Sequence, residues 1–221
     1  MDFPNAFRPV RRSLIAALVL FAAGLGSALA QGLVEGKNYL RLKNPQSVDS
    51  GKNVEVLYFF SYMCPHCRDF DPELQPWLKQ LPADVDFKRV PVDFGRDQWA
   101  NLGKVLYTLE ALGAEKSMTS EVFVAVHDKK LQLWQDKVFF DWAASKGLDR
   151  KKVEDTYNSF GVGSKMSRAR QLAKNYNVQS VPVVFIDGKF QVSAENVGTH
   201  ANMPAAMTEL IAKARAERPK S

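Results

Sequence analysis

Cysteine is scarce in this chain, which has only two among its 221 residues, and the two lie close together as Cys64 and Cys67. Small exported domains that depend on disulfides for stability usually contain several of them. A bridge between these two cysteines would close a two-residue gap and would remove little entropy from the unfolded chain. We therefore expect the pair to serve chemistry rather than stability.

Histidine is also scarce, and the three in the chain are His66, His127 and His200. A structural zinc site normally takes four ligands, and the sequence has no second cysteine pair to supply them. Covalent haem attachment requires a histidine directly after the second cysteine, where this chain has Arg68. We expect no metal and no cofactor beyond a redox-active disulfide, and we interpret His127 and His200 as structural or surface residues.

The charge of the chain shows no concentrated patch of one sign. The 30 basic and 24 acidic residues give a net charge of +6. The densest basic stretch, at residues 150–152, is followed by Glu154 and Asp155, which is typical of a solvated helix face. Nucleic acid is therefore not an expected partner, and the 46% of hydrophobic residues suffices for one ordinary core.

The amino terminus has the three-part order of a secretory signal peptide. Three arginines lie within the first twelve residues, and an apolar run follows at residues 14–23. This run is too short to favour a membrane-spanning helix, and small side chains at Ala28 and Ala30 suit a signal peptidase. We predict a signal peptide at residues 1–30 with cleavage after Ala30, the alternative being an uncleaved anchor.

The pattern after the signal predicts strands around a helix that begins at the cysteines. Residues 39–42 read as an edge strand, and residues 54–60 form a nearly continuous apolar run, typical of a strand that is buried on both faces. Apolar positions from Phe70 onward recur at helical spacing. Pro72 and Pro76 each remove a backbone donor, so this helix should bend or split, with a kink near Asp71.

The rest of the chain predicts a helical block between two sets of strands. A strand at 85–92 precedes residues 98–175, whose apolar residues recur mostly at three and four. One periodic stretch ends at Phe160 and has Asp149 as its expected N-cap, and a final helix is expected at 164–176. A hairpin around Asp187 and Gly188 and a closing helix at 206–214 complete the order β-β-α-β, helical block, β-β-α.

The spacing of the two cysteines predicts thiol chemistry at the start of a helix. Unpaired N–H groups and the positive end of the helix dipole stabilise a thiolate at Cys64. Cys67, one turn further on, should be the more buried partner. Pro65 suits the first helical turn, and the His66 ring could donate a hydrogen bond or a positive charge to the thiolate.

The segments Phe59-Phe60-Ser61, Cys64-Pro65-His66-Cys67 and Val181-Pro182 resemble the DsbA family of bacterial periplasmic oxidants. The resemblance covers nearly the whole chain after the signal. It implies an α/β architecture, a thioredoxin-like fold with an inserted all-helical subdomain. The thioredoxin-like domain would comprise residues 31–97 and 176–221, and the inserted helical domain residues 98–175.

The resemblance also implies roles for particular residues. Pro182 would be a cis-proline beside the active site, and the backbone of Val181 would help to bind an extended substrate segment. Family members often have a buried acid where this chain has Tyr58. Asp71 and Glu55 are candidate substitutes for that acid, although either could equally face solvent, so the path of the Cys67 proton is left open.

The aromatic residues near the motif could form a groove for unfolded polypeptide. We assign Phe59 and Phe60 mainly to the core, because strand interiors are usually buried, and Tyr62 and Met63 to an exposed rim.

The function implied by the resemblance is that of a periplasmic oxidant that transfers its disulfide to newly exported proteins with free thiols. It would act through a mixed disulfide at Cys64, be reoxidised by a DsbB-like quinone-coupled membrane protein, and be a monomer. A disulfide reductase or isomerase is one alternative, although residues 31–50 leave no room for a dimerisation domain. A peptide-binding chaperone with incidental cysteines is another.

Overall fold

The computed structural model of the protein describes residues 32–218. The predicted signal peptide at 1–30 and its cleavage site after Ala30 lie outside the described residues. Within residues 32–218, no helix is both long and apolar enough to cross a membrane.

The centre of the fold is a five-stranded sheet with the order β1-β5-β4-β2-β3. Only β2 and β3 are parallel, and the other neighbouring strands are antiparallel. The strands are β1 (Leu40–Arg41), β2 (Val54–Phe60), β3 (Val85–Pro91), β4 (Val183–Ile186) and β5 (Phe190–Val192). The predicted strands and their order along the chain are thereby confirmed.

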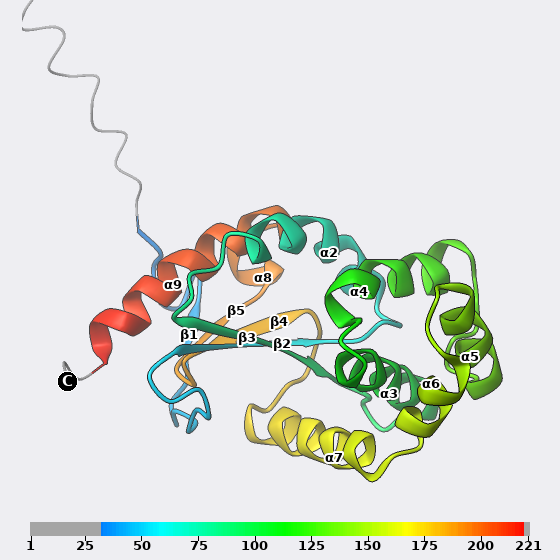
Figure 1. Cartoon of the computed structure of the whole chain (residues 1–221). Coiled ribbons are helices and arrows are strands. Elements are labelled where there is room, and N and C mark those ends of the chain that lie inside the picture. Colours follow the sequence, from blue (N-terminus) through cyan, green and yellow to red (C-terminus); the bar gives the residue numbers. More distant parts are fainter. Residues whose placement is uncertain (1–31, 219–221) are drawn as a thin grey trace, which may run out of the picture. The chain divides into compact units, whose positions relative to one another are not determined.

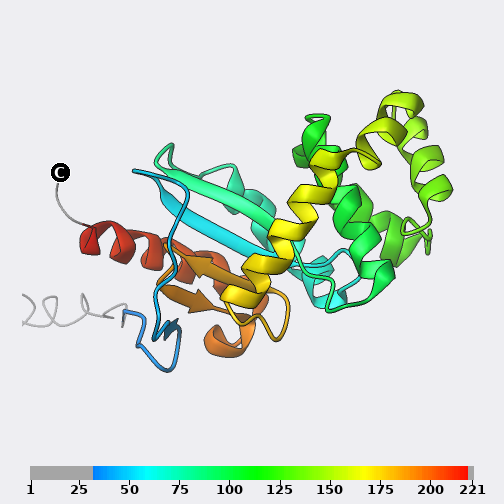
Figure 2. The same ribbon diagram turned by 90° about the horizontal axis from the view of Figure 1, so that it is seen from below.

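The strand β2 is buried along its whole length, as its apolar run predicts. On one face Tyr58 packs edge-to-face against Phe70, and on the other Phe59 packs against Tyr176. The first face is covered by α2 (Pro65–Leu78) and α9 (Met203–Glu217), and α7 (Phe160–Asn175) crosses the second (Figures 1 and 2). Layers of helix therefore cover both faces, and the carboxyl end of β2 leads into the short segment before α2.

The helix α2 runs without interruption through Pro72 and Pro76, so of the two predicted outcomes it does not split, and the bend with a kink near Asp71 stays a prediction. Each proline leaves the carbonyl group four residues earlier without its helical donor. Those carbonyls belong to Arg68 and Pro72, which are both exposed, so water can satisfy them.

Helices fill the chain between β3 and β4, and all of them except α7 gather at one end of the sheet (Figure 1). They are α3 (Asp97–Ala111), α4 (Glu115–Phe123), a π-helix η1 (Val124–Asp128), α5 (Asp136–Ser145), α6 (Arg150–Tyr157) and α7. The predicted helical block is confirmed, although the sequence pattern did not indicate the π-helix. Its division as a separate domain at residues 98 and 175 stays a prediction.

The predicted helix through Phe160 is wrong at its end. Asp149 does cap α6 and accepts a hydrogen bond from the Lys152 amide at 2.8 Å, but α6 stops at Tyr157. The Ser159 hydroxyl accepts from the amide of Val162 at 3.2 Å and starts α7 four residues earlier than predicted. Phe160 therefore lies at a helix start and is 90% exposed instead of packing in the core.

The hairpin between β4 and β5 has the predicted two-residue turn. Asp187 and Gly188 have φ values of 53° and 64°, the left-handed conformation that this type of turn requires. A Cβ atom at Gly188 would lie 2.1 Å from the carbonyl oxygen of Gln46, so glycine is required for space as well. Two short helices that were not predicted, α8 (Ala194–Val197) and η2 (His200–Asn202), lead into α9.

Candidate active site

The two cysteines lie where β2 passes into α2, as predicted. Cys64 is the N-cap of α2 with extended backbone, and Pro65 occupies the first turn. Cys64 is 6% exposed and Cys67 is fully buried, and both are free thiols. Cys67 is thus the more buried partner, in agreement with the prediction.

The surroundings of the two thiols shift their pKa values in opposite directions. Hydrogen bonding from the Cys67 side chain, helped by backbone N–H groups at Cys67 and His66 and by the charge of His66, lowers the pKa of Cys64 from 9.0 to about 6 against the opposing effect of burial. Burial raises the pKa of Cys67 well above its ordinary value. At neutral pH the reduced pair therefore holds a thiolate at Cys64 and a thiol at Cys67.

The loop before β4 completes the site. The Val181–Pro182 peptide bond is cis, as the resemblance implies. The Cys64 thiol donates a hydrogen bond to the Val181 carbonyl oxygen at 3.4 Å. The structure therefore brings together Cys64, Cys67, Val181 and Pro182 from two distant parts of the chain.

A second histidine lies beside the motif. The rings of His66 and His200 have centroids 5.9 Å apart, and the His200 ring lies 6.0 Å from that of Phe70. His66 is exposed, in keeping with its position in the first turn of α2. No local sequence pattern indicates this position of His200, because it is the packing of η2 against α2 that places it there.

The predicted rim is half wrong. Phe59 and Phe60 are core residues as expected, and Met63 is partly exposed, but Tyr62 is only 1% exposed. The Tyr62 hydroxyl bonds to Thr119 at 3.1 Å, and its ring packs against Phe123 of α4. The helical insertion therefore covers Tyr62.

His127 also has a contact at this loop. Its Nε2 atom lies within hydrogen-bond distance, 2.8 Å, of the Tyr62 carbonyl oxygen. Since His127 belongs to the π-helix η1, the helical insertion contacts both the main chain and the side chain of Tyr62, just before Cys64.

The candidate substitutes for a buried acid lie on different faces of β2. Glu55 is buried and pairs with Lys88 at 2.8 Å. Because side chains alternate along a strand, Glu55 points to the face opposite Tyr58, which faces α2. Asp71 is also buried, on α2 itself, and accepts hydrogen bonds from Gln75 at 2.8 Å and from Ser120 at 2.5 Å. Neither carboxylate faces solvent, and of the two only Asp71 lies on the side of the cysteines.

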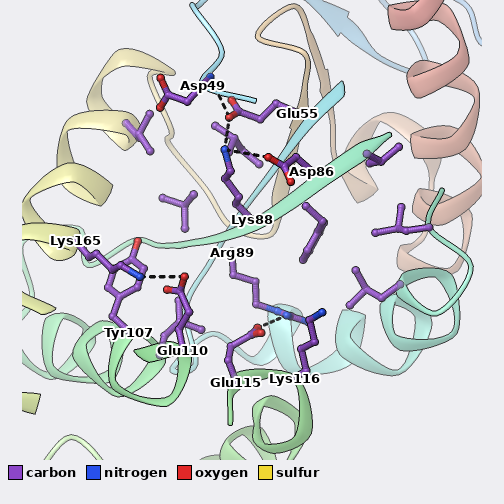
Figure 3. Close-up of a pocket in the computed structure, with 18 of the residues that line it drawn as sticks. Asp49, Glu55, Asp86, Lys88, Arg89, Tyr107, Glu110, Glu115, Lys116 and Lys165 are labelled. Atoms are coloured by element: carbon purple, nitrogen blue, oxygen red, sulfur yellow. Dashed lines mark hydrogen bonds and ion pairs between the residues drawn. The ribbon is translucent and has the colours of Figure 1, made fainter. Parts of the chain in front are cut away.

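A cavity of about 830 Å³ lies along β3 (Figure 3). Ion pairs cross its walls, including Lys165 with Glu110 at 3.0 Å and Arg89 with Glu115. Neither cysteine lines this cavity, so its size does not mark the redox site.

Comparison with known proteins agrees with the geometry. The pattern of the DSBA-like thioredoxin domain family matches residues 55–203. The chain is 38% identical over 185 residues to the thiol:disulfide interchange protein DsbA of Burkholderia cepacia, covering 81% of this chain and 86% of that protein. It is 35% identical over 208 residues to the protein of the same name from Pseudomonas aeruginosa, covering 94% and 98%.

Solved structures give the same result. The crystal structure of Pseudomonas aeruginosa DsbA aligns with a TM-score of 0.78 at 37% identity, covering 83% of this chain and 95% of that one. Reduced DsbA1 from Neisseria meningitidis aligns with a TM-score of 0.76 at 27% identity, covering 85% and 97%. The family match, the relatives and the site at Cys64 and Cys67 agree, and the chain belongs to the DsbA family of thioredoxin-like thiol:disulfide oxidoreductases.

Proposed function

We propose that this protein is a periplasmic oxidant that transfers a Cys64–Cys67 disulfide to newly exported proteins. The observation that carries the proposal is the placement of Cys64 at the N-cap of α2 beside the fully buried Cys67, which lowers the pKa of Cys64 to about 6 and raises that of Cys67. A stabilised Cys64 thiolate favours the reduced enzyme, and a favoured reduced form makes the disulfide form a stronger oxidant.

The reaction proceeds by two exchanges. A substrate thiolate attacks the Cys64 sulfur, the bond to Cys67 breaks, and Cys67 leaves as a thiolate that must take up a proton. A second substrate thiolate then attacks the substrate sulfur of the mixed disulfide, and Cys64 leaves as its stabilised thiolate. The substrate gains a disulfide, and the enzyme gains two electrons.

The neighbouring residues have supporting roles in this proposal. Pro65 starts the helix whose N–H groups face Cys64, and His66 adds an exposed ring whose positive charge favours the thiolate. The Val181 carbonyl lies beside Cys64, where the main chain of an extended substrate could pair with the loop that ends at Pro182. The disulfide itself is the redox group, with no further cofactor.

The proposed setting follows from the signal-like residues 1–30 and from the relatives, which are named thiol:disulfide interchange protein DsbA. The partners would be unfolded exported proteins with free thiols and a DsbB-like quinone-coupled membrane protein that reoxidises Cys64 and Cys67. The protein would act as a monomer without nucleic acid.

A glutathione redox titration of residues 31–221, with oxidation of a dithiol peptide as the activity readout, tests the proposal. We expect an oxidising potential and stoichiometric oxidation of the peptide, both lost in the Cys64→Ala, Cys67→Ala double variant. A strongly reducing potential would instead indicate a reductase. A double variant that still binds unfolded polypeptide as the wild type does would indicate a peptide-binding chaperone.

A further inference from the structure

Tyr58 is a buried tyrosine with a fixed ring. Its side chain is 1% exposed, stacks on Phe60 at a centroid distance of 5.3 Å, and meets Phe70 edge-to-face at 5.5 Å. The ring of Phe87 lies 6.3 Å away. With aromatic neighbours from β2, α2 and β3, the ring has no room to turn its hydroxyl toward solvent.

The Tyr58 hydroxyl has no hydrogen-bond partner among the described residues. A buried hydroxyl without a partner is costly, so native structures keep few of them. The reactive group on this side of β2 is the fully buried Cys67 thiol, one helical turn before Phe70, and its charge contributes, after burial, to raising the pKa of Tyr58. The same contact acts on Cys67 in the opposite direction and favours its thiolate.

Charged groups from three elements surround this pair. Arg89 of β3 favours negative charge near Tyr58, and Asp71 of α2 opposes it. Arg89 is paired with Glu115 of α4, which offsets part of its charge. Since burial raises the pKa of Tyr58 well above its ordinary value, the phenol stays protonated and can only be a donor toward an anion.

The proposed function creates an anion at this place. When a substrate thiolate attacks Cys64, the sulfur of Cys67 becomes a thiolate in a fully buried position, where an unpaired charge is strongly disfavoured. Cys64 is at that moment bonded to the substrate sulfur, so it has no S–H group to donate to the Cys67 thiolate.

We infer that the Tyr58 hydroxyl donates a hydrogen bond to the departing Cys67 sulfur and so speeds formation of the mixed disulfide. This inference rests on the proposed function. In this step the substrate sulfur bonds to Cys64, the Cys64–Cys67 bond breaks, and its electron pair goes to Cys67. Tyr58 keeps its proton throughout, so Cys67 leaves as a hydrogen-bonded thiolate.

The test compares Tyr58→Phe with Tyr176→Phe. Both variants keep the ring and remove a buried hydroxyl that has no partner among residues 32–218, but Tyr176 lies on the other face of β2, against Phe59 and Phe185. Single-turnover oxidation of a dithiol peptide should slow about tenfold or more in Tyr58→Phe, as for loss of a hydrogen bond to a charged group, and should be unchanged in Tyr176→Phe.

Thermal unfolding separates chemistry from structure. Loss of an unpartnered hydroxyl should leave the melting temperature of both variants unchanged or higher. A wild-type rate in Tyr58→Phe, or an equal slowing in both variants, would overturn the inference.

A second measurement does not depend on oxidant activity. In a Cys64→Ala background, the ¹³Cβ chemical shift of Cys67 reports its ionisation. Adding Tyr58→Phe should raise the pKa of Cys67 by about one pH unit or more, since the thiolate loses its donor. An unchanged midpoint would contradict the hydrogen bond even in a protein that oxidises peptides well, and a raised midpoint in an inactive protein would count against the proposed function alone.

Discussion

The Cys64 thiol donates a hydrogen bond to the carbonyl oxygen of Val181, which lies 117 positions further along the chain, at a distance of 3.4 Å. Only the protonated thiol can make this bond. When Cys64 ionises or forms a disulfide, the Val181 carbonyl loses its donor and becomes available to another N–H group. The contact therefore links the redox state of Cys64 to a free acceptor beside it.

The low pKa of Cys64 predicts how the stability of the reduced protein depends on pH. The folded state lowers this pKa from 9.0 to about 6, so the stabilising contribution is complete above pH 9 and is lost as pH falls through 6. Urea unfolding of the reduced protein between pH 5 and 9 should show this loss relative to Cys64→Ala, which has no thiol at this position to ionise. Parallel pH profiles for the two proteins would contradict the assignment.

The causes of the Cys64 pKa can be ranked by substitution. The hydrogen bond from Cys67 is the largest cause, and the charge of His66 is a smaller one. Cys67→Ala should therefore raise the pKa of Cys64 by about one pH unit or more, and His66→Ala should raise it less. Thiolate absorbance in the ultraviolet measures both values. The opposite order would make His66 the main determinant.

Local pattern was enough to predict the centre of this fold. The apolar run of β2 and the cysteine spacing at the start of α2 each follow from neighbouring residues, and so does the turn at Asp187 and Gly188. The misplaced helix boundary before Phe160 is a local error, but the positions of Tyr62 and His200 were missed because distant segments decide their environment. Nothing near Tyr62 in sequence indicates that α4 covers it, and nothing near His200 indicates that it packs beside His66.

Because α4 covers Tyr62, the hydroxyls of Tyr62 and Thr119 should be coupled in their effect on stability. The Thr119 hydroxyl donates to the Glu115 carbonyl oxygen at 2.8 Å, so toward Tyr62, 3.1 Å away, it accepts. Thr119→Val keeps the shape but leaves the Tyr62 hydroxyl buried without a partner, which should cost about 1–3 kcal/mol in the free energy of unfolding. Adding Tyr62→Phe should restore much of that loss in urea unfolding. Strictly additive losses would show that the two hydroxyls are not coupled.

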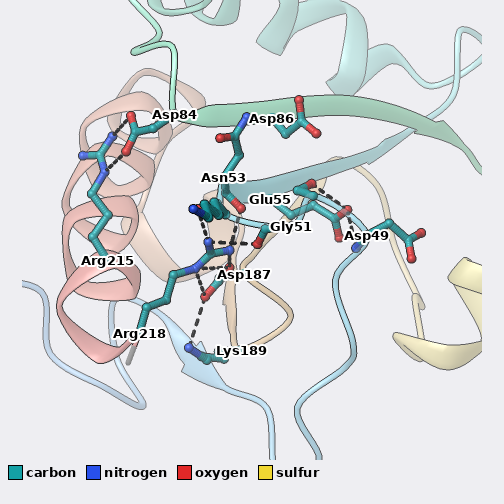
Figure 4. Close-up of polar contacts among 12 residues, drawn as sticks. Asp49, Gly51, Asn53, Glu55, Asp84, Asp86, Asp187, Lys189, Arg215 and Arg218 are labelled. Atoms are coloured by element: carbon teal, nitrogen blue, oxygen red, sulfur yellow. Dashed lines mark hydrogen bonds and ion pairs between the residues drawn. The ribbon is translucent and has the colours of Figure 1, made fainter. Parts of the chain in front are cut away.

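Arg215 in the last turn of α9 and Arg218 directly after that helix should differ in their contribution to stability (Figure 4). Arg218 pairs with Asp187 at 2.5 Å, where the side chains are 19% and 3% exposed, and also donates to the carbonyl oxygens of Lys52 and Asn53. Arg218→Ala removes this partner from a buried carboxylate and leaves Lys189 at 3.1 Å. Breaking a buried pair in this way should cost about 3 kcal/mol in the free energy of unfolding.

Arg215, in the last turn of α9, is the matched control, because it forms a similar pair in a more exposed environment. It contacts Asp84 at 2.6 and 2.7 Å, but those side chains are 38% and 52% exposed. An exposed ion pair contributes at most about 1 kcal/mol, so Arg215→Ala should shift the urea midpoint much less than Arg218→Ala. High salt should weaken the Arg215 pair further and leave the Arg218 pair nearly unchanged, since screening acts mainly on exposed charges. Equal losses for the two variants would mean that Arg218 adds only surface charge and does not fasten α9 to the hairpin turn at Asp187.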